Sequence, residues 1–118
     1  MVLSVVIPAY NEEESITETI DQIEEAFSKV NIEHEIYVVN DNSKDNTLQV
    51  LEQLSQKYPA LTYGTNHGPN GFGYAIRYGL ERYKGDCVAI MMADLSDDPD
   101  DLVLFYRRLL VGDVDCVF

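Results

Sequence analysis

Basic residues are scarce in this chain. Its 118 residues include 8 Lys and Arg against 21 Asp and Glu, which gives a formal net charge of −13. This balance argues against a partner such as nucleic acid or an anionic membrane surface, because both attract Lys and Arg. If the ligand is itself an anion, we expect a divalent cation to mediate the contact.

Cysteine and long apolar runs are also scarce. The two cysteines, Cys87 and Cys116, lie in apolar runs, form no metal-binding motif and fit a reducing cytosol. The N-terminal run MVLSVVIP lacks the basic region of a signal peptide. No stretch approaches the roughly 20 apolar residues that span a bilayer. We therefore expect this chain to be cytoplasmic.

The apolar pattern predicts strands and helices in alternation. Short apolar, often β-branched runs at 2–7, 36–39, 61–65, 87–93 and 114–118 are typical of buried strands. The segments between them repeat apolar residues at helical spacing: Ile16, Ile20, Ile23 and Phe27; Leu48, Leu51 and Leu54; Phe72, Ala75, Ile76, Leu80 and Tyr83; Leu102, Phe105, Tyr106 and Leu109. This order predicts an α/β fold, with a Rossmann-like, mostly parallel sheet and helices on both faces, in one domain over residues 1–118.

Local signals place the helix starts. Asn11 is a predicted N-cap, with Glu12–Glu14 favourably placed in the first turn of the first helix. Asp45 is the corresponding candidate for the second helix, and Pro99 lies near the first turn of the fourth.

The most polar loops all follow predicted strands. They read PAYNEE, NDNSKDNT, NHGPNGFG and ADLSDDPDD, whereas the loops at the opposite end are short and plain. Ligands of open parallel sheets bind outside the carboxyl ends of the strands. The asymmetry therefore predicts a ligand site on this rim.

The last of these loops is unusually acidic. Asp94, Asp97, Asp98, Asp100 and Asp101 follow the fourth apolar run within eight residues, and their charges repel one another. The last two suit a helix start, where acids are favourable. Asp94 follows the strand directly and does not fit that explanation. We interpret this loop as a site for a cation.

Simpler interpretations exist for the single residues of the other loops. Tyr10 and Glu12 could be a surface aromatic and a helix-start charge, and Asp41 could be an ordinary turn residue. Asn70 and Gly71 form a common turn dipeptide. The two histidines carry no assigned role.

Several known motifs are absent or incomplete. The dinucleotide fingerprint fails because its third glycine would fall at Ile76, and the sequence has no P-loop, zinc pattern or readable Ser–His or Cys–His pair. A phospho-receiver module would need acids after the first strand and a lysine after the fifth. The first loop here reads PAYNEE, which disfavours that class.

Four motifs together resemble a known family. PAYNEEESI, VVNDNSKDNT, GFGYAIRYGL and MMADLSDDP occur in an order that resembles the family-2 inverting glycosyltransferases of GT-A fold. The sequence looks closest to the polyprenyl-phosphate sugar transferases, the dolichol-phosphate mannose synthase type. The resemblance covers the whole chain and implies the nucleotide-binding half of a GT-A domain. It implies transfer of a sugar from a UDP- or GDP-sugar, with inversion, to dolichyl or undecaprenyl phosphate or to a sugar acceptor at the cytoplasmic face of the membrane.

The resemblance also implies roles for individual residues. Those expected to bind the nucleotide-sugar donor are Pro8, Ala9, Tyr10, Glu12, Asp41, Gly71, Gly73 and Asp94. Asp41 would contact the base, and the two glycines would allow the third loop to approach the donor closely. Asp94 matches the last acid of the Asp-x-Asp motif, which holds Mg²⁺ or Mn²⁺ on the diphosphate, here with help from Asp97 or Asp98.

The sequence departs from the family pattern at several points. Met92 stands where the metal motif has its first aspartate, Asn40 replaces the first acid of the second loop, and Ser96 stands where lipid-type members often carry Gln. Two alternatives follow: a non-catalytic nucleotide-sugar-binding or scaffold domain that has lost its metal, and a nucleotidyltransferase. The second is disfavoured because its glycine-rich, basic first loop is absent.

The chain ends on a predicted strand, where the acceptor half of a GT-A domain should begin. We therefore expect the catalytic base to lie beyond Phe118, and this chain alone to bind a donor without turnover. We also expect a homo-oligomer that covers the sheet edge and apolar surface left bare by truncation.

Overall fold

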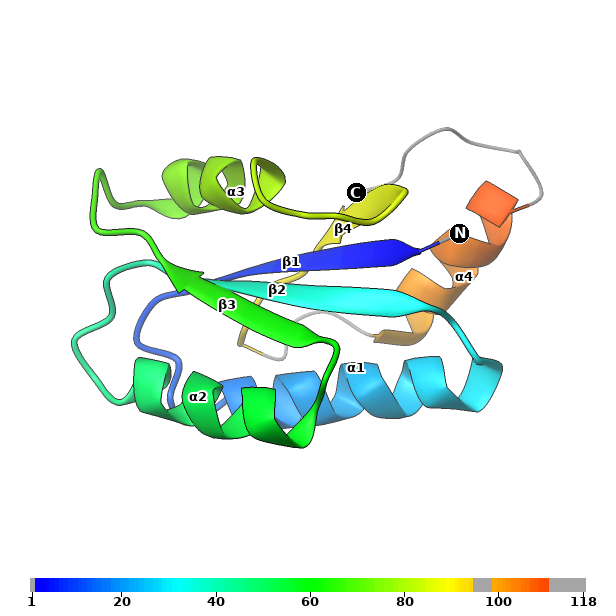
Figure 1. The fold of residues 1–118 in the computed structure, drawn as a ribbon, viewed down its shortest axis with the longest axis horizontal. Coiled ribbons are helices and arrows are strands. Elements are labelled where there is room, and N and C mark those ends of the chain that lie inside the picture. Colours follow the sequence, from blue (N-terminus) through cyan, green and yellow to red (C-terminus); the bar gives the residue numbers. More distant parts are fainter. Residues whose placement is uncertain (1, 95–98, 111–118) are drawn as a thin grey trace.

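The computed structural model describes residues 2–94 and 99–110. Its strands form a parallel sheet in the order β3-β2-β1-β4 (Figure 1). The strands are β1 (Leu3–Ala9), β2 (His34–Asn40), β3 (Leu61–Thr65) and β4 (Cys87–Ile90), and the helices are α1 (Ile16–Val30), α2 (Thr47–Lys57), α3 (Phe72–Leu80) and α4 (Pro99–Leu110). The predicted Rossmann-like α/β fold is confirmed. The fifth strand, predicted at 114–118, lies outside the described residues.

Helices cover both faces of the sheet, as predicted. α1 and α2 lie on one face and α3 on the other (Figure 1). The side chains of β1 alternate between the two faces, as in any strand. Val5 and Ile7 pack with Ile20 of α1 in the larger core, which Tyr106 of α4 also joins. The smaller core, under α3, consists of Val6, Val39, Ala75 and Val88.

α3 packs closely on the sheet because it carries a glycine there. A Cβ atom at Gly79 would overlap the side chain of Val6 and would lie 3.2 Å from Cγ2 of Val39. Only a residue without a side chain permits this approach.

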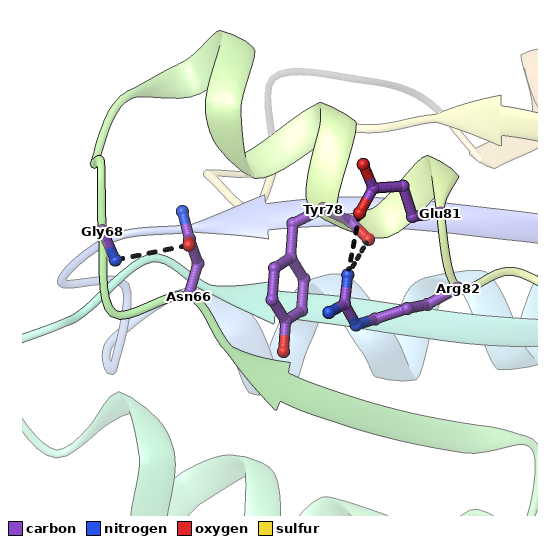
Figure 2. A network of polar contacts seen from close by, with 5 residues as sticks. All are labelled: Asn66, Gly68, Tyr78, Glu81 and Arg82. Carbon is purple, nitrogen blue, oxygen red and sulfur yellow. Dashed lines mark hydrogen bonds and ion pairs between the residues drawn. The ribbon is translucent and has the colours of Figure 1, made fainter.

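A small aromatic cluster follows on the same face. The Arg82 guanidinium lies 3.5 Å from the ring centroid of Tyr78, and its Nη1 donates to the Tyr78 carbonyl at 3.0 Å (Figure 2). Burial raises the pKa of the neighbouring Tyr37 hydroxyl, and the nearby Tyr78 raises it further. Tyr37 of β2 thus interacts with Tyr78 near the C-terminal end of α3.

The first strand differs from the prediction at its end. β1 continues through Pro8 to Ala9 instead of closing at the proline. The Val6 carbonyl accepts the Met91 N–H on the β4 side, and Pro8 has the same parity in the strand. The ladder with β4 ends at Val6, so the missing N–H of Pro8 leaves no ladder hydrogen bond unmade. β4 itself is shorter than predicted and ends at Ile90.

Two predicted helix starts are wrong. α1 begins at Ile16 with Ser15 as N-cap, not at Asn11, so Glu12–Glu14 precede the helix. The backbone of Asn11 is left-handed, with φ of 53°, and its polar groups bond across to the next loop. The N-cap of α2 is Asn46, one residue after the predicted Asp45.

The buried face of α3 also differs from the prediction. Phe72 is 57% exposed and Leu80 38% exposed, whereas Ala75 and Gly79 are buried. Within the described residues, every helix is too short or too polar to cross a membrane.

Candidate functional site

A cleft of about 630 Å³ opens at the carboxyl ends of β1 and β2, beside the start of α3. Its volume falls within the range of about 300–1,000 Å³ that is typical of small-molecule sites. The residues that line it are Pro8, Ala9, Tyr10, Glu12, Asp41, Asn42, Lys44, Asn70, Gly71, Phe72, Ala75 and Met92. The edge of the sheet that loop polarity predicted as a ligand site therefore does carry a cleft.

The structure brings together most of the residues predicted to bind the donor. Those that line the cleft are Pro8, Ala9, Tyr10, Glu12, Asp41 and Gly71. Gly73 is not among the lining residues and is exposed in the first turn of α3. Asp94 lines a second cavity, and Asp97 lies outside the described residues. Contact with a donor remains a prediction for each of them.

Hydrogen bonds tie the loop after β1 to the loop after β2. The Asn11 N–H donates to Oγ of Ser43 at 3.0 Å, and Oδ1 of Asn11 accepts the Lys44 N–H at 2.8 Å. The Glu12 N–H donates to Oγ1 of Thr47 at 3.0 Å. These hydrogen bonds join the two loops and so hold Tyr10 and Glu12 at the cleft.

Asp45 belongs to the same hydrogen-bond network. Its Oδ1 accepts the Thr47 N–H at 2.9 Å and also contacts the Thr47 hydroxyl, and its Oδ2 accepts the Glu13 N–H at 3.3 Å. Burial raises the pKa of Asp45 and is the largest single effect. The hydrogen bonds from Thr47 and Glu13 together outweigh it, so the pKa of Asp45 is below its usual value.

Asp41, in the loop after β2, bonds to the end of β1 and to the loop after β3, and it is only 6% exposed. Its N–H donates to the Ala9 carbonyl at 2.8 Å, which continues the β1–β2 pairing. Its Oδ1 accepts from Nδ2 of Asn66 and from Nδ2 of Asn70, both at 3.1 Å. Its Oδ2 accepts the Gly71 N–H at 2.8 Å. Both oxygens of this buried carboxylate therefore have hydrogen-bond donors.

The chain beyond β4 is fixed on the start of α1. Oγ of Ser15 lies 2.8 Å from the Ala93 carbonyl, and Oγ1 of Thr19 lies 3.0 Å from the same oxygen. Asp94 follows directly and lines a cavity of about 450 Å³ together with Asn11, Glu12, Glu13, Glu14, Ser15 and Asp45. Glu12 lines both cavities, so the two are neighbours.

The described residues do not form a metal site on their own. Across residues 2–94 and 99–110, no group of three or more His, Cys, Asp and Glu side chains is arranged to hold a metal ion. In nucleotide sites, however, Mg²⁺ is held by one or two carboxylates, and the phosphates supply further ligands. Asp94, beside Glu12 and next to the cleft, fits that donor set.

Several lining residues were not predicted as site residues: Asn42, Lys44, Asn70, Phe72, Ala75 and Met92. Lys44 is the one basic residue of this lining. A lysine in a polar loop of a chain so rich in acidic residues is a sequence signal that could have predicted a site residue. Met92 had been noted only as a missing acid. No local pattern distinguishes Phe72 from the buried positions of a helix.

His34 carried no predicted role and lies away from the cleft, at the amino end of β2. Its Nε2 is 3.1 Å from Oε2 of Glu24. Its ring meets Phe27 edge to face, with centroids 4.8 Å apart.

A parallel sheet with helices on both faces and a cleft at the carboxyl ends of its strands defines a Rossmann-like α/β domain. Sequence comparison makes this class more specific. The family described as "Glycosyl transferase family 2" matches residues 4–118. The chain therefore belongs to glycosyl transferase family 2.

Named relatives and a solved structure agree. The chain is 34% identical over 104 residues to an undecaprenyl-phosphate 4-deoxy-4-formamido-L-arabinose transferase of Pseudomonas savastanoi pv. phaseolicola, over 85% of this chain and 30% of that protein. It is 36% identical over 100 residues to a dolichol-phosphate mannosyltransferase of Pyrococcus furiosus, over 85% and 28%. The mannosyltransferase PcManGT of Pyrobaculum calidifontis, solved with GDP-Man and Mn²⁺, has a TM-score of 0.71 and 30% identity, over 85% of this chain and 30% of that one. The chain thus spans about 30% of the length of these proteins.

Proposed function

We propose that this chain is the donor-binding part of a glycosyltransferase that takes a sugar from a nucleotide diphosphate donor. One observation carries the proposal. In a family-2 chain, the cleft at the strand ends is lined by the residues expected to meet the nucleotide, among them Tyr10, Glu12 and Asp41.

The charges of the site fit an anionic donor that arrives with a cation. A nucleoside diphosphate is repelled by a chain of net charge −13 unless a positive ion intervenes. We propose that Asp94 holds Mg²⁺ or Mn²⁺, which, when bound, neutralises the charge that develops on the diphosphate leaving group. Lys44, at the cleft, adds a second positive charge from the chain itself.

We further propose that the acceptor is a polyprenyl phosphate and that the whole protein acts at the cytoplasmic face of a membrane. The support is the acceptor named for the relatives of Pseudomonas and Pyrococcus. In this reaction the acceptor oxygen attacks the anomeric carbon from the face opposite the diphosphate. The new C–O bond forms as the sugar–phosphate bond breaks, so the configuration inverts. A phosphate acceptor is already an anion and needs little help from a general base.

The test is calorimetric titration of the chain with UDP and with GDP, in Mg²⁺, in Mn²⁺ and in EDTA. We expect binding that requires the metal. If neither nucleotide binds with either metal, the proposal is wrong.

A matched pair of variants tests the role of Asp94. Asp94→Asn should abolish the metal-dependent binding of the nucleotide. Asp101→Asn, an equal change of charge in the first turn of α4, should leave that binding intact. Unchanged metal-dependent binding by Asp94→Asn would favour the scaffold interpretation. Transfer itself is measured on the whole protein, with polyprenyl phosphate as acceptor.

A further inference from the structure

We propose that Asn66 and Asn70 are positioning residues that hold the Asp41 carboxylate in the cleft for the nucleoside of the donor. This inference rests on the proposed function and assigns a task to two side chains outside the predicted site. It follows from how the three residues are bonded.

The two amides occupy one oxygen of the carboxylate. Nδ2 of Asn66 and Nδ2 of Asn70 each lie 3.1 Å from Oδ1 of Asp41. Among the described residues, the one donor to the other oxygen, Oδ2, is the Gly71 N–H at 2.8 Å. A carboxylate oxygen can accept about two hydrogen bonds. The arrangement therefore fills Oδ1 and leaves acceptor capacity at Oδ2, on a side chain that lines the cleft.

Asn66 is built into the loop after β3 for this contact. It is only 7% exposed, and its N–H donates to the Asn40 carbonyl at 2.9 Å, next to the end of the β2–β3 pairing. The second donor position of its Nδ2 is taken by the Pro69 carbonyl at 3.0 Å. Its Oδ1 accepts the Gly68 N–H at 3.4 Å (Figure 2). Both ends of the buried amide are satisfied, so its orientation toward Asp41 is fixed.

Asn70 acts from the other end of the same loop. Besides Oδ1 of Asp41, its Nδ2 lies 3.3 Å from the Asp41 carbonyl and 3.3 Å from the Asn66 carbonyl. Asn70 itself lines the cleft. Gly71, the next residue, is the N-cap of α3, and its φ of 135° is a backbone conformation that favours glycine.

The chemistry of the donors matters as well as their positions. Asn66, Asn70 and Gly71 are all neutral N–H donors, so they orient Asp41 without cancelling its charge. A charged carboxylate accepts a hydrogen bond more strongly than a neutral group does. Asp41 is thus kept ready for an N–H donor, the group that the edge of a nucleic-acid base presents.

The experiment is a double-mutant cycle on nucleotide affinity, measured by calorimetry with UDP and GDP in Mn²⁺. We expect Asn66→Ala and Asn70→Ala each to weaken binding about tenfold, the change that one good hydrogen bond corresponds to. In an Asp41→Asn background, Asn70→Ala should weaken binding less than twofold, because its task is already lost. Asn46→Ala, whose side chain makes no cap hydrogen bond, is the matched control and should bind as the unmodified chain does.

A second variant remains informative if the alanine variants fold poorly. Asn70→Asp places a second carboxylate beside Oδ1 of Asp41, where like charges repel. Its affinity relative to the unmodified chain should be low at pH 8 and should recover at pH 5, when a proton can be shared between the two carboxyls. Glu12 and Lys44 also line the cleft, and comparison with the unmodified chain at each pH removes their contribution.

The outcomes separate the two proposals. If the unmodified chain binds neither nucleotide, both the proposed function and this inference are wrong. If it binds, and Asn70→Ala has an equal effect with and without Asp41→Asn, or Asn70→Asp shows no recovery at low pH, only the positioning role is overturned.

Discussion

The backbone N–H of Glu12 donates to Oγ1 of Thr47 at 3.0 Å, and the Thr47 side chain has no exposed surface. This hydrogen bond joins the loop after β1, which brings Tyr10 to the cleft, to the first turn of α2. The same hydroxyl contacts the Asp45 carboxylate. One buried oxygen therefore connects two of the three loops of the site.

Thr47→Val should destabilise the protein and weaken nucleotide binding together. Valine keeps the shape but leaves the Glu12 N–H without this acceptor, which corresponds to about 1–3 kcal/mol of unfolding free energy. Urea denaturation and calorimetric binding measure the two effects. Thr47→Ser, which keeps the hydroxyl, is the control and should retain most of the affinity. A loss of affinity in Thr47→Ser as large as that in Thr47→Val would contradict a specific role for the hydrogen bond.

Asp45 should make the stability depend on pH at the acid end. Its pKa in the folded state is lower than the ordinary value of 3.8. The folded state therefore binds a proton less readily than the unfolded state. Its stabilising contribution is complete above about pH 4 and is lost as the pH falls below that value, through the lowered pKa.

The variant Asp45→Asn tests this contribution, because it keeps an acceptor oxygen but cannot titrate in this range. We expect the unmodified protein to be the more stable of the two at pH 6, with the difference shrinking toward pH 3. Chemical denaturation at several pH values measures it. A difference that does not change between pH 6 and pH 3 would contradict the lowered pKa.

The sheet and its helices could be predicted because apolar periodicity reports burial directly. The two faces of β1 and the buried stripe of α1 are each decided by residues such as Val5, Val6 and Ile20, which have no alternative to burial. The predicted helix start at Asn11 is wrong because it depends on distant contacts. Its left-handed backbone depends on bonds to Ser43 and Lys44, about thirty residues away, and local capping rules do not include such partners.

Gly79→Ala should destabilise the protein by separating α3 from the sheet. A methyl group at this position would overlap Val6, and overpacking of this kind costs about 1–3 kcal/mol. The control lies in the same helix: a methyl group at Gly73 meets nothing within 4 Å. Alanine there should be neutral or stabilising, by up to about 1 kcal/mol. Thermal and urea denaturation of the two variants compare them, and equal destabilisation would refute the packing argument.

Tyr58 should link α1 and α2 through Asp21. Its hydroxyl donates to Oδ1 of Asp21, which also lies 3.3 Å from Nζ of Lys57. The hydrogen bond to Asp21, followed by burial, raises the pKa of Tyr58 above 10.0. The folded state thus holds this proton more tightly, so the contribution is complete below about pH 10 and is lost as the pH rises through the raised pKa.

Tyr58→Phe should lower the unfolding free energy at neutral pH by about 0.5–1.5 kcal/mol, the value of one net hydrogen bond. The ultraviolet difference spectrum between the two proteins isolates the titration of this phenol. In Asp21→Asn, the pKa of Tyr58 should move back toward 10.0. A phenol that titrates identically with and without Asp21 would argue against the bond.

The site could be predicted less completely than the fold. The position of the rim and the lining by Tyr10, Glu12 and Asp41 followed from the order of the loops and from the family motifs. The hydrogen bond from Asn66 to Asp41 could not be predicted from the sequence, because an Asn-rich loop is equally typical of plain turns. It needs the parallel neighbours β2 and β3, whose carboxyl ends bring the two residues together.

Phe72 gives the most direct test of the cleft, because its aromatic ring is 57% exposed and lines the cavity. Tyr74, two residues later in α3, is 48% exposed and is not among the lining residues. Neither ring is held in a core, so Phe72→Ala and Tyr74→Ala should each change the unfolding free energy by no more than about 0.5 kcal/mol.

Of these two variants, only Phe72→Ala should affect nucleotide binding. A ring against a base contributes about 1–3 kcal/mol, so we expect Phe72→Ala to weaken UDP or GDP binding at least fivefold. Calorimetry in Mn²⁺ compares the two variants, and equal affinities would mean that the nucleotide does not bind against the α3 side of the cleft.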